Sequence, residues 1–251
     1  MSAVSFTILA AILGVSLLSM PVYAVMGLRR DADQDGKGAR FFMGQGDFLL
    51  HWFMWAIHPL VKFSLALGLT PDFYNYAGLA LGLAAGALIA VGRLEAGGWA
   101  VVLCGVADIL DGRIARATGV ASAFGDFVDS TFDRFVEVFL FLGFAYYLRS
   151  SASRSILAQA AMAGSLVVSY VRARGEVLGV RCTGGLMQRG ERLVLICLVC
   201  LVEPPLVAYR GWAPGSLVTW MLGFLAVTTT FTVVHRTLWI GSRLRANSGS
   251  R

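Results

Sequence analysis

Four aspartates occur as two closely spaced pairs inside otherwise apolar sequence. Asp108 and Asp111 stand in an i, i+3 relation and Asp129 and Asp133 in an i, i+4 relation, so each pair shares one face of a helix. An aspartate near the centre of a membrane helix costs about 2.5–3.5 kcal/mol on insertion scales, so four of them require compensation. Hard divalent cations such as Mg²⁺, Mn²⁺ or Ca²⁺ compensate carboxylates that converge. The spacing therefore predicts a divalent-metal site.

Small residues and an arginine accompany the acidic pairs. Gly112 and Gly125 have no side chain, so a ligand can approach the helix backbone closely at these positions. Ala115 is also small, and Arg116 supplies a fixed positive charge that suits a phosphate group. Because two metal ions can clamp a displacement at phosphorus, this combination indicates a site for a phosphorylated substrate.

The elements that carry these residues must be membrane helices. The 251 residues are 57% hydrophobic and only 14% charged, and mean hydropathy is +0.70, beyond the range of ordinary soluble domains. The chain is thus expected to be an all-α, polytopic membrane bundle. Seven stretches are long enough to cross a bilayer, and they are expected roughly at 5–28, 74–92, 97–115, 127–148, 156–171, 193–209 and 216–235. A short connection makes 97–115 and 127–148 antiparallel neighbours whose carboxylates face each other.

Charge distribution predicts the orientation of the bundle. The segment 47–69 is apolar and aromatic but carries His51, His58 and Lys62, which fits a helix lying in the membrane interface. With that assignment, only four of the 21 Lys and Arg residues fall outside, namely Arg93, Arg149, Arg154 and Arg210. The positive-inside rule then places the aspartates near the cytoplasmic face of the cell (inner) membrane. The net charge of +6 has the same explanation, and we expect no nucleic-acid partner because no basic patch contains interleaved aromatic residues outside an apolar span.

The acidic stretch resembles a known family signature. The pattern D-x2-D-G-x2-A-R-x8-G-x3-D-x3-D, typical of CDP-alcohol phosphotransferases, is filled at every fixed position by Asp108, Asp111, Gly112, Ala115, Arg116, Gly125, Asp129 and Asp133. The resemblance extends over roughly 60–236 and implies the six-helix core of that family. The first span then looks like an extra N-terminal transmembrane helix. The family also tends to form homodimers, so a homodimer is possible here.

The resemblance implies a reaction and roles for these residues. The reaction is transfer of a phosphatidyl group from CDP-diacylglycerol to an alcohol, with release of CMP. Two divalent cations, Mg²⁺ or Mn²⁺, would be held by Asp108, Asp111, Asp129 and Asp133, and Asp133 would also act as general base. The CDP group would be bound by Asp108, Gly112, Ala115, Arg116 and Gly125. A family element before the first core helix, Thr-Pro-Asn, is replaced by Thr-Pro-Asp72, so the contact could come from Asp72 or from Asn75.

A second cluster bears on the acceptor. Arg172 and Arg174 follow the fifth span, and Arg189 and Arg192 precede the sixth. They are either flanking charges or ligands for a phosphate on the acceptor. Their segments resemble those of phosphatidylinositol-phosphate synthases, which implies a phosphorylated polyol such as inositol phosphate, although Gly175 and Gln188 depart from that pattern. A phosphatidylglycerophosphate synthase, which uses glycerol 3-phosphate, is the close alternative.

A divalent-cation channel or carrier is the alternative of a different class, since carboxylates within a membrane can line a permeation path. The sequence disfavours it, because the aspartates lie near one face and no carboxylates continue the path across the membrane. We thus expect five segments. They are an N-terminal transmembrane helix at 1–28, a cytoplasmic linker at 29–46, an interfacial helix at 47–69, the phosphotransferase core at 70–236 and a basic cytoplasmic tail at 237–251.

Overall fold

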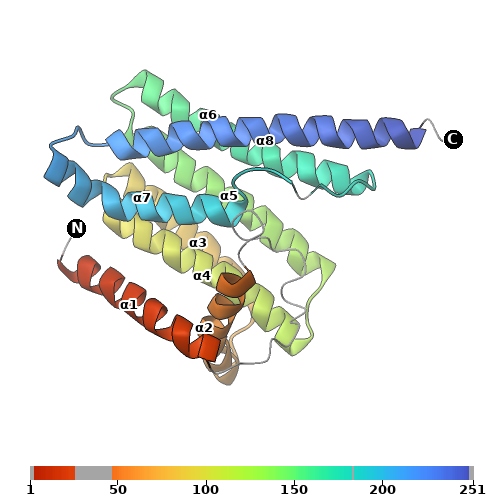
Figure 1. Ribbon diagram of the computed structural model, residues 1–251, viewed down its shortest axis with the longest axis horizontal. Helices are drawn as coiled ribbons and strands as arrows, with labels where there is room; N and C mark the ends of the chain where they lie inside the picture. Colours follow the sequence, from red (N-terminus) through yellow and green to blue (C-terminus); the bar gives the residue numbers. More distant parts are fainter. Residues whose placement is uncertain (1–2, 26–46, 183, 249–251) are drawn as a thin grey trace.

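The computed structural model describes residues 3–25, 47–182 and 184–248, and within these ranges it contains helices and no strand (Figure 1). The expected all-α architecture is confirmed. The expected cytoplasmic linker at 29–46 lies outside the described residues. The described helices are α1 Ala3–Val25, α2 Asp47–Ala66, α3 Pro71–Ala90, α4 Leu94–Thr118, α5 Ala123–Tyr147, α6 Ala152–Val177, α7 Arg189–Arg210 and α8 Ser216–Ser248.

Helices α3 to α8 form one bundle around a common apolar core. The α3 helix packs on α4 and α5, α4 packs on α7, and α6 packs on both α5 and α8. Phe141 and Phe144 of α5, Ile196 of α7 and Leu222 of α8 are at most 2% exposed at the centre of this core. Successive helices run in opposite directions, so the α4–α5 and α6–α7 connections lie at the same end of the bundle (Figure 1).

Four helices of the bundle are each long and apolar enough to cross a membrane: α3, α6, α7 and α8. The α4 and α5 helices are also 25 residues long. They carry the four aspartates together with neighbouring arginines, which lower the hydropathy of the C-terminal half of α4 and the N-terminal half of α5. The exceptional polarity of α4 and α5 thus coincides with the predicted site.

The packing of α4 and α5 differs from the sequence-based expectation. These two helices make few direct contacts, because α3 packs against both of them. The α3 and α5 backbones approach closely at Gly86 and Gly143, where a Cβ on Gly143 would collide with the Gly86 carbonyl oxygen. The α3 helix thus packs its apolar surface against both α4 and α5. The carboxylates of α4 and α5 therefore meet only where the two helices converge, near their connecting loop.

The α2 helix lies at a steep angle to the bundle helices in Figure 1. Ile57 and Val61 of α2 are buried with Leu110 and Ile114 of α4, and a guanidinium nitrogen of Arg113 donates to the Met54 carbonyl oxygen at 2.6 Å. The α2 helix therefore covers the C-terminal half of α4, beside the acidic motif.

The last helix is longer than the sequence indicated. Its predicted span ends at residue 235, yet α8 continues through much of the expected tail to Ser248. Ile240 is buried together with Val180 and Cys182 of the α6–α7 connection, and Trp239 and Leu244 pack beside them. This apolar stripe on the tail gives the additional turns a surface on which to pack.

Candidate active site

The turn between α4 and α5 brings the two halves of the motif to one end of the bundle. Gly119 ends α4 in the left-handed conformation with φ 71°, where glycine is favoured because it lacks a Cβ. Ser122 begins α5, and its side-chain oxygen accepts a hydrogen bond from the backbone N–H of Gly125 at 3.2 Å. Gly125 therefore lies in the first turn of α5.

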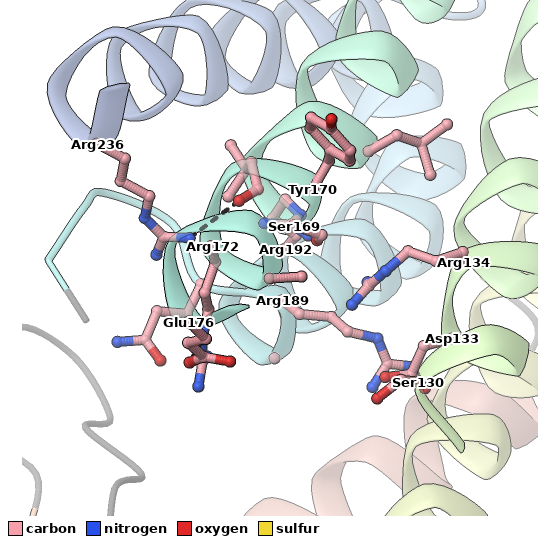
Figure 2. A pocket seen from close by; sticks show the side chains of 15 residues that line it. Ser130, Asp133, Arg134, Ser169, Tyr170, Arg172, Glu176, Arg189, Arg192 and Arg236 are labelled. Atoms are coloured by element: carbon pink, nitrogen blue, oxygen red, sulfur yellow. Dashed lines mark hydrogen bonds and ion pairs between the residues drawn. The ribbon is translucent and has the colours of Figure 1, made fainter. Parts of the chain in front are cut away.

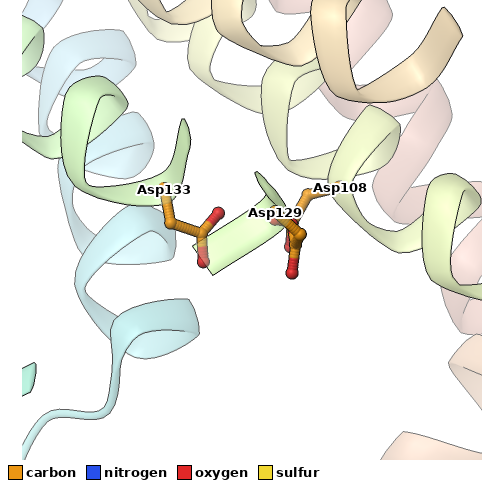
Figure 3. A group of neighbouring side chains, drawn as sticks. All are labelled: Asp108, Asp129 and Asp133. Atoms are coloured by element: carbon orange, nitrogen blue, oxygen red, sulfur yellow. The ribbon is translucent and has the colours of Figure 1, made fainter. Parts of the chain in front are cut away.

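Three of the predicted aspartates converge. Asp108 of α4 and Asp129 and Asp133 of α5 each offer an oxygen, and these oxygens all lie within 4.8 Å of one another (Figure 3). Asp111, which is 6% exposed, lies outside this trio but lines the same small cavity. Partly buried carboxylates at this range repel one another, and a set of oxygen donors alone suits a hard divalent cation. The donor set thus fits the predicted metal chemistry.

The wall of this small cavity includes residues from α3. Asn75 is 8% exposed and lines the cavity together with Tyr74, whereas Asp72 is exposed. The hydroxyls of Tyr74 and Ser64 are hydrogen bonded at 2.6 Å, which connects the cavity wall to α2. Of the two positions left open by the sequence, Asn75 is the one that lies beside the carboxylates.

Arg189, the first residue of α7, contacts two of the carboxylates. One guanidinium nitrogen donates to Asp108 Oδ1 at 2.9 Å, and the other lies 2.5 Å from Asp133 Oδ1. A capping box fixes the start of α7, because the Gln188 backbone N–H donates to the Glu191 carboxylate at 2.9 Å. The positive end of the α7 dipole adds to the positive charge of Arg189 beside the acidic trio.

A second, larger cavity of about 670 Å³ opens between α5, α6, α7 and α8. In Figure 2, Arg236 and Asp133 lie at opposite sides of this cavity, with Arg172 and Arg189 between them. Its lining has two carboxylates, Asp133 and Glu176, and five arginines: Arg134, Arg172, Arg189, Arg192 and Arg236. This excess of positive charge fits an anionic ligand, because guanidinium groups bind phosphate well. We name it the arginine cavity.

One wall of the arginine cavity is held by a buried ion pair. Arg192 of α7 contacts Glu137 of α5, and another nitrogen of the same guanidinium donates to the Met187 carbonyl oxygen at 3.0 Å. The second carboxylate oxygen of Glu137 lies 3.6 Å from Arg134. Because the Arg192 and Glu137 side chains are both 3% exposed, Glu137 fixes the place of Arg192 in the cavity wall.

Two of the cavity arginines were not singled out as site residues by sequence reasoning. Arg134 directly follows Asp133, and Arg236 lies on α8. Arg236 is 5% exposed and donates to the carbonyl oxygens of Gly184 at 2.8 Å and Val168 at 3.1 Å. A signal for Arg236 is present in the sequence, since Thr228, Thr232 and Arg236 are spaced four residues apart and so share one face of the helix.

The remaining predicted residues lie around the two cavities. Arg172 lines the arginine cavity and forms a 3.0 Å ion pair with Glu176, whereas Arg174 is exposed and lies outside the cavity. Of the residues expected to bind CDP, Asp108 belongs to the acidic trio. The others lie beyond the trio, toward the α4–α5 loop, and are Gly112, Ala115, Arg116 and Gly125. A Cβ on Gly112 would lie 3.2 Å from an Arg116 guanidinium nitrogen, so these two neighbours share one surface of α4.

Comparison with known proteins identifies relatives over most of the six-helix bundle, from α3 into α8. The family model described as CDP-alcohol phosphatidyltransferase matches residues 69–234. A phosphatidylinositol phosphate synthase of Mycobacteroides abscessus is 38% identical over 187 residues, which cover 71% of this chain and 80% of that protein. An archaetidylinositol phosphate synthase of Methanothermobacter thermautotrophicus is 31% identical over 179 residues, which cover 71% of this chain and 87% of that protein.

Solved structures show the same similarity. The crystal structure of the Mycobacterium tuberculosis phosphatidylinositol phosphate synthase with CDP-DAG bound matches with a TM-score of 0.65 at 30% identity, over 72% of this chain and 92% of that chain. The same enzyme in complex with manganese and citrate matches with a TM-score of 0.65 at 30% identity, over 72% and 87% of the two chains. These similarities favour a membrane transferase over a cation channel or carrier.

Proposed function

We propose a specific reaction for this chain, which belongs to the CDP-alcohol phosphatidyltransferase family and is an integral membrane transferase. It transfers the phosphatidyl group of CDP-diacylglycerol to a hydroxyl of inositol phosphate and releases CMP. The names of its relatives support this acceptor, and the CDP-DAG bound to the M. tuberculosis enzyme supports this donor. The observation that carries the proposal is the juxtaposition of the arginine cavity with Asp133.

The acidic trio and Asp111 would hold two divalent cations, Mg²⁺ or Mn²⁺. The oxygens of Asp108, Asp129 and Asp133 lie within 4.8 Å of one another, and Asp111 faces the same cavity. The manganese in the M. tuberculosis structure is consistent with this cofactor. When bound, such ions would screen the negative charge of the pyrophosphate and stabilise the charge that develops at phosphorus.

Asp133 is the proposed general base. Of the four aspartates, it alone lines both the small acidic cavity and the arginine cavity. Its carboxylate would take the proton of the acceptor hydroxyl while the hydroxyl oxygen forms a bond to the phosphatidyl phosphorus. The bond between that phosphorus and the CMP oxygen breaks, so CMP leaves with the electron pair.

The arginine cavity would bind the phosphate of the acceptor. Of the arginines predicted from the sequence, Arg172, Arg189 and Arg192 line it, and Arg134 and Arg236 join them. On the other side of Asp133, the proposed CDP contacts include Asp108, Asn75 and the residues on the inner turns of α4 and α5, Gly112, Ala115, Arg116 and Gly125. Asp133 would thus stand between the acceptor and the nucleotide.

The proposed topology places the site at the cytoplasmic face of the cell (inner) membrane. Arg93, Arg149 and Arg210 lie at the ends of α4, α5 and α7 that are remote from the aspartates, which supports this orientation by the positive-inside rule. In the same proposal, α1 is an additional transmembrane helix, α2 lies in the interface, and the bundle of α3 to α8 is the catalytic core. Homodimer formation stays a prediction, which cross-linking in native membranes can test.

An acceptor screen tests the proposed reaction. Purified protein in detergent micelles, supplied with CDP-diacylglycerol and Mg²⁺ or Mn²⁺, should release CMP fastest with inositol phosphate. The other acceptors are glycerol 3-phosphate, inositol and serine. Preference for glycerol 3-phosphate or for an unphosphorylated alcohol would refute the acceptor assignment, and absence of CMP with all four would refute the transferase assignment.

A matched pair of variants controls this screen. Asp133→Asn removes the proposed base and should abolish CMP release. Asp126→Asn makes the same chemical change two turns earlier on α5, at an exposed position outside both cavities, and should leave the rate near that of the wild type. Similar rates in the two variants would contradict the role of Asp133.

A further inference from the structure

We infer that Arg189 is a positioning residue that couples the metal centre to the acceptor cavity by competing with divalent cations for Asp108 and Asp133. The inference rests on the proposed function, because it takes these aspartates as metal ligands. Arg189 is the one arginine that lines both cavities among the residues the structure describes. Its two terminal nitrogens contact Asp108 and Asp133, and its Nε is buried with no hydrogen-bond partner among the described residues.

A guanidinium in this position and a divalent cation oppose each other. Both would bind the same partly buried carboxylates, whose side chains are only 29% exposed at Asp108 and 14% exposed at Asp133. Like charges within a few ångströms repel strongly where water is largely excluded. Tight binding of a cation by Asp108 and Asp133 therefore requires the Arg189 side chain to move away from them.

The arginine cavity is the place to which Arg189 can move. This side chain already forms part of the cavity wall, and rotation about its side-chain bonds turns the guanidinium toward the cavity without a change in α7. An acceptor phosphate bound there would replace the carboxylates as the partner of the guanidinium. Metal binding then favours phosphate binding, and by linkage phosphate binding favours metal binding to the same degree.

The other arginines of the cavity are held by groups outside the acidic trio. Arg192 and Arg134 both contact Glu137. Arg236 donates to two backbone carbonyls, and Arg172 pairs with Glu176. Their positions do not depend on whether the acidic trio holds a cation. The coupling is therefore assigned to Arg189.

The test measures Mn²⁺ affinity by electron paramagnetic resonance of the full-length protein in micelles, without and with inorganic phosphate. A protein-free titration at each phosphate concentration corrects for Mn²⁺ bound by phosphate itself. In the wild type, phosphate should tighten Mn²⁺ binding by about 5- to 150-fold, the usual range of coupling between sites. Arg189→Gln should bind Mn²⁺ at least about fivefold more tightly than the wild type without phosphate, and phosphate should add no further tightening.

Three variants make the result specific. Arg189→Lys keeps the positive charge and should keep a phosphate dependence, which separates competition by charge from a general disturbance of α7. Arg210→Ala removes an exposed arginine at the opposite end of the same helix and should behave as the wild type. Asp129→Asn should weaken Mn²⁺ binding in every condition.

The outcomes separate the inference from the proposed function. Equal phosphate dependence in the wild type and Arg189→Gln would overturn the inference, as would the absence of any phosphate dependence in the wild type or weaker Mn²⁺ binding by Arg189→Gln. Mn²⁺ binding that is insensitive to Asp129→Asn would instead refute the proposed metal centre, and the inference would fall with it.

Discussion

Replacement of Glu137 by glutamine tests the buried ion pair that holds one wall of the arginine cavity. Glu137 and Arg192 are in direct contact and their side chains are each 3% exposed, so the variant leaves a buried guanidinium without its counter-charge. Breaking one side of such a pair typically costs about 3–5 kcal/mol. The Arg134 contact, at 3.6 Å with a side chain that is 35% exposed, is screened by solvent and should add less than about 1 kcal/mol.

A double-mutant cycle measures this pair in equilibrium unfolding experiments in micelles. Glu137→Gln and Arg192→Gln should each lower the free energy of unfolding by about 3–5 kcal/mol. In the double variant neither charge is left without a partner. Its loss of unfolding free energy should therefore be smaller than the sum of the two single losses, and the difference should be about 1–3 kcal/mol. Glu176→Gln is the matched control, since its pair with Arg172 is exposed and should contribute at most about 1 kcal/mol. Additive losses, within about 0.5 kcal/mol, would refute the reasoning.

Two further changes follow from the described contacts. Glu203 is 2% exposed, and its two oxygens accept from the backbone N–H groups of Gly215 at 2.6 Å and Val218 at 2.8 Å, at the start of α8. Glu203→Ala should therefore lower the free energy of unfolding by about 3 kcal/mol or more, with a smaller loss for the glutamine variant, as measured by denaturant unfolding. Arg236→Ala removes a charge from the cavity wall and should raise KM for a phosphorylated acceptor by about tenfold or more. In the same CMP-release assay, Arg243→Ala, an exposed change on α8, should not alter KM.

Local sequence spacing was informative wherever the chemistry lies within one helix or one turn. The positions of Asp108 and Asp111 on α4, and of Asp129 and Asp133 on α5, follow from helical periodicity and a short connection. The trio of carboxylates in the structure agrees with this spacing. Periodicity does not specify which helices become neighbours, and α3 accordingly packs between α4 and α5 although they are consecutive in the chain.

The ends of elements were harder to place, because they depend on partners far away in the sequence. The α8 helix extends to Ser248 since Ile240 meets Val180 and Cys182 of the preceding connection. Similarly, the choice between Asp72 and Asn75 required the packing of α3, which buries Asn75 beside the carboxylates and leaves Asp72 exposed. Neither result is encoded in the spacing of neighbouring residues.

The sequence by itself determined that this protein is a helical membrane protein with a carboxylate motif at one end of two helices, because hydropathy and helical periodicity are local properties of the chain. The tertiary structure alone decided which charges meet. Arg189 contacts Asp108, which lies 81 positions away in the sequence, and Glu137 contacts Arg192, which lies 55 positions away. Such pairings depend on the relative placement of separate helices, which is set by the packing of their apolar faces and not by the spacing of the charges along the chain.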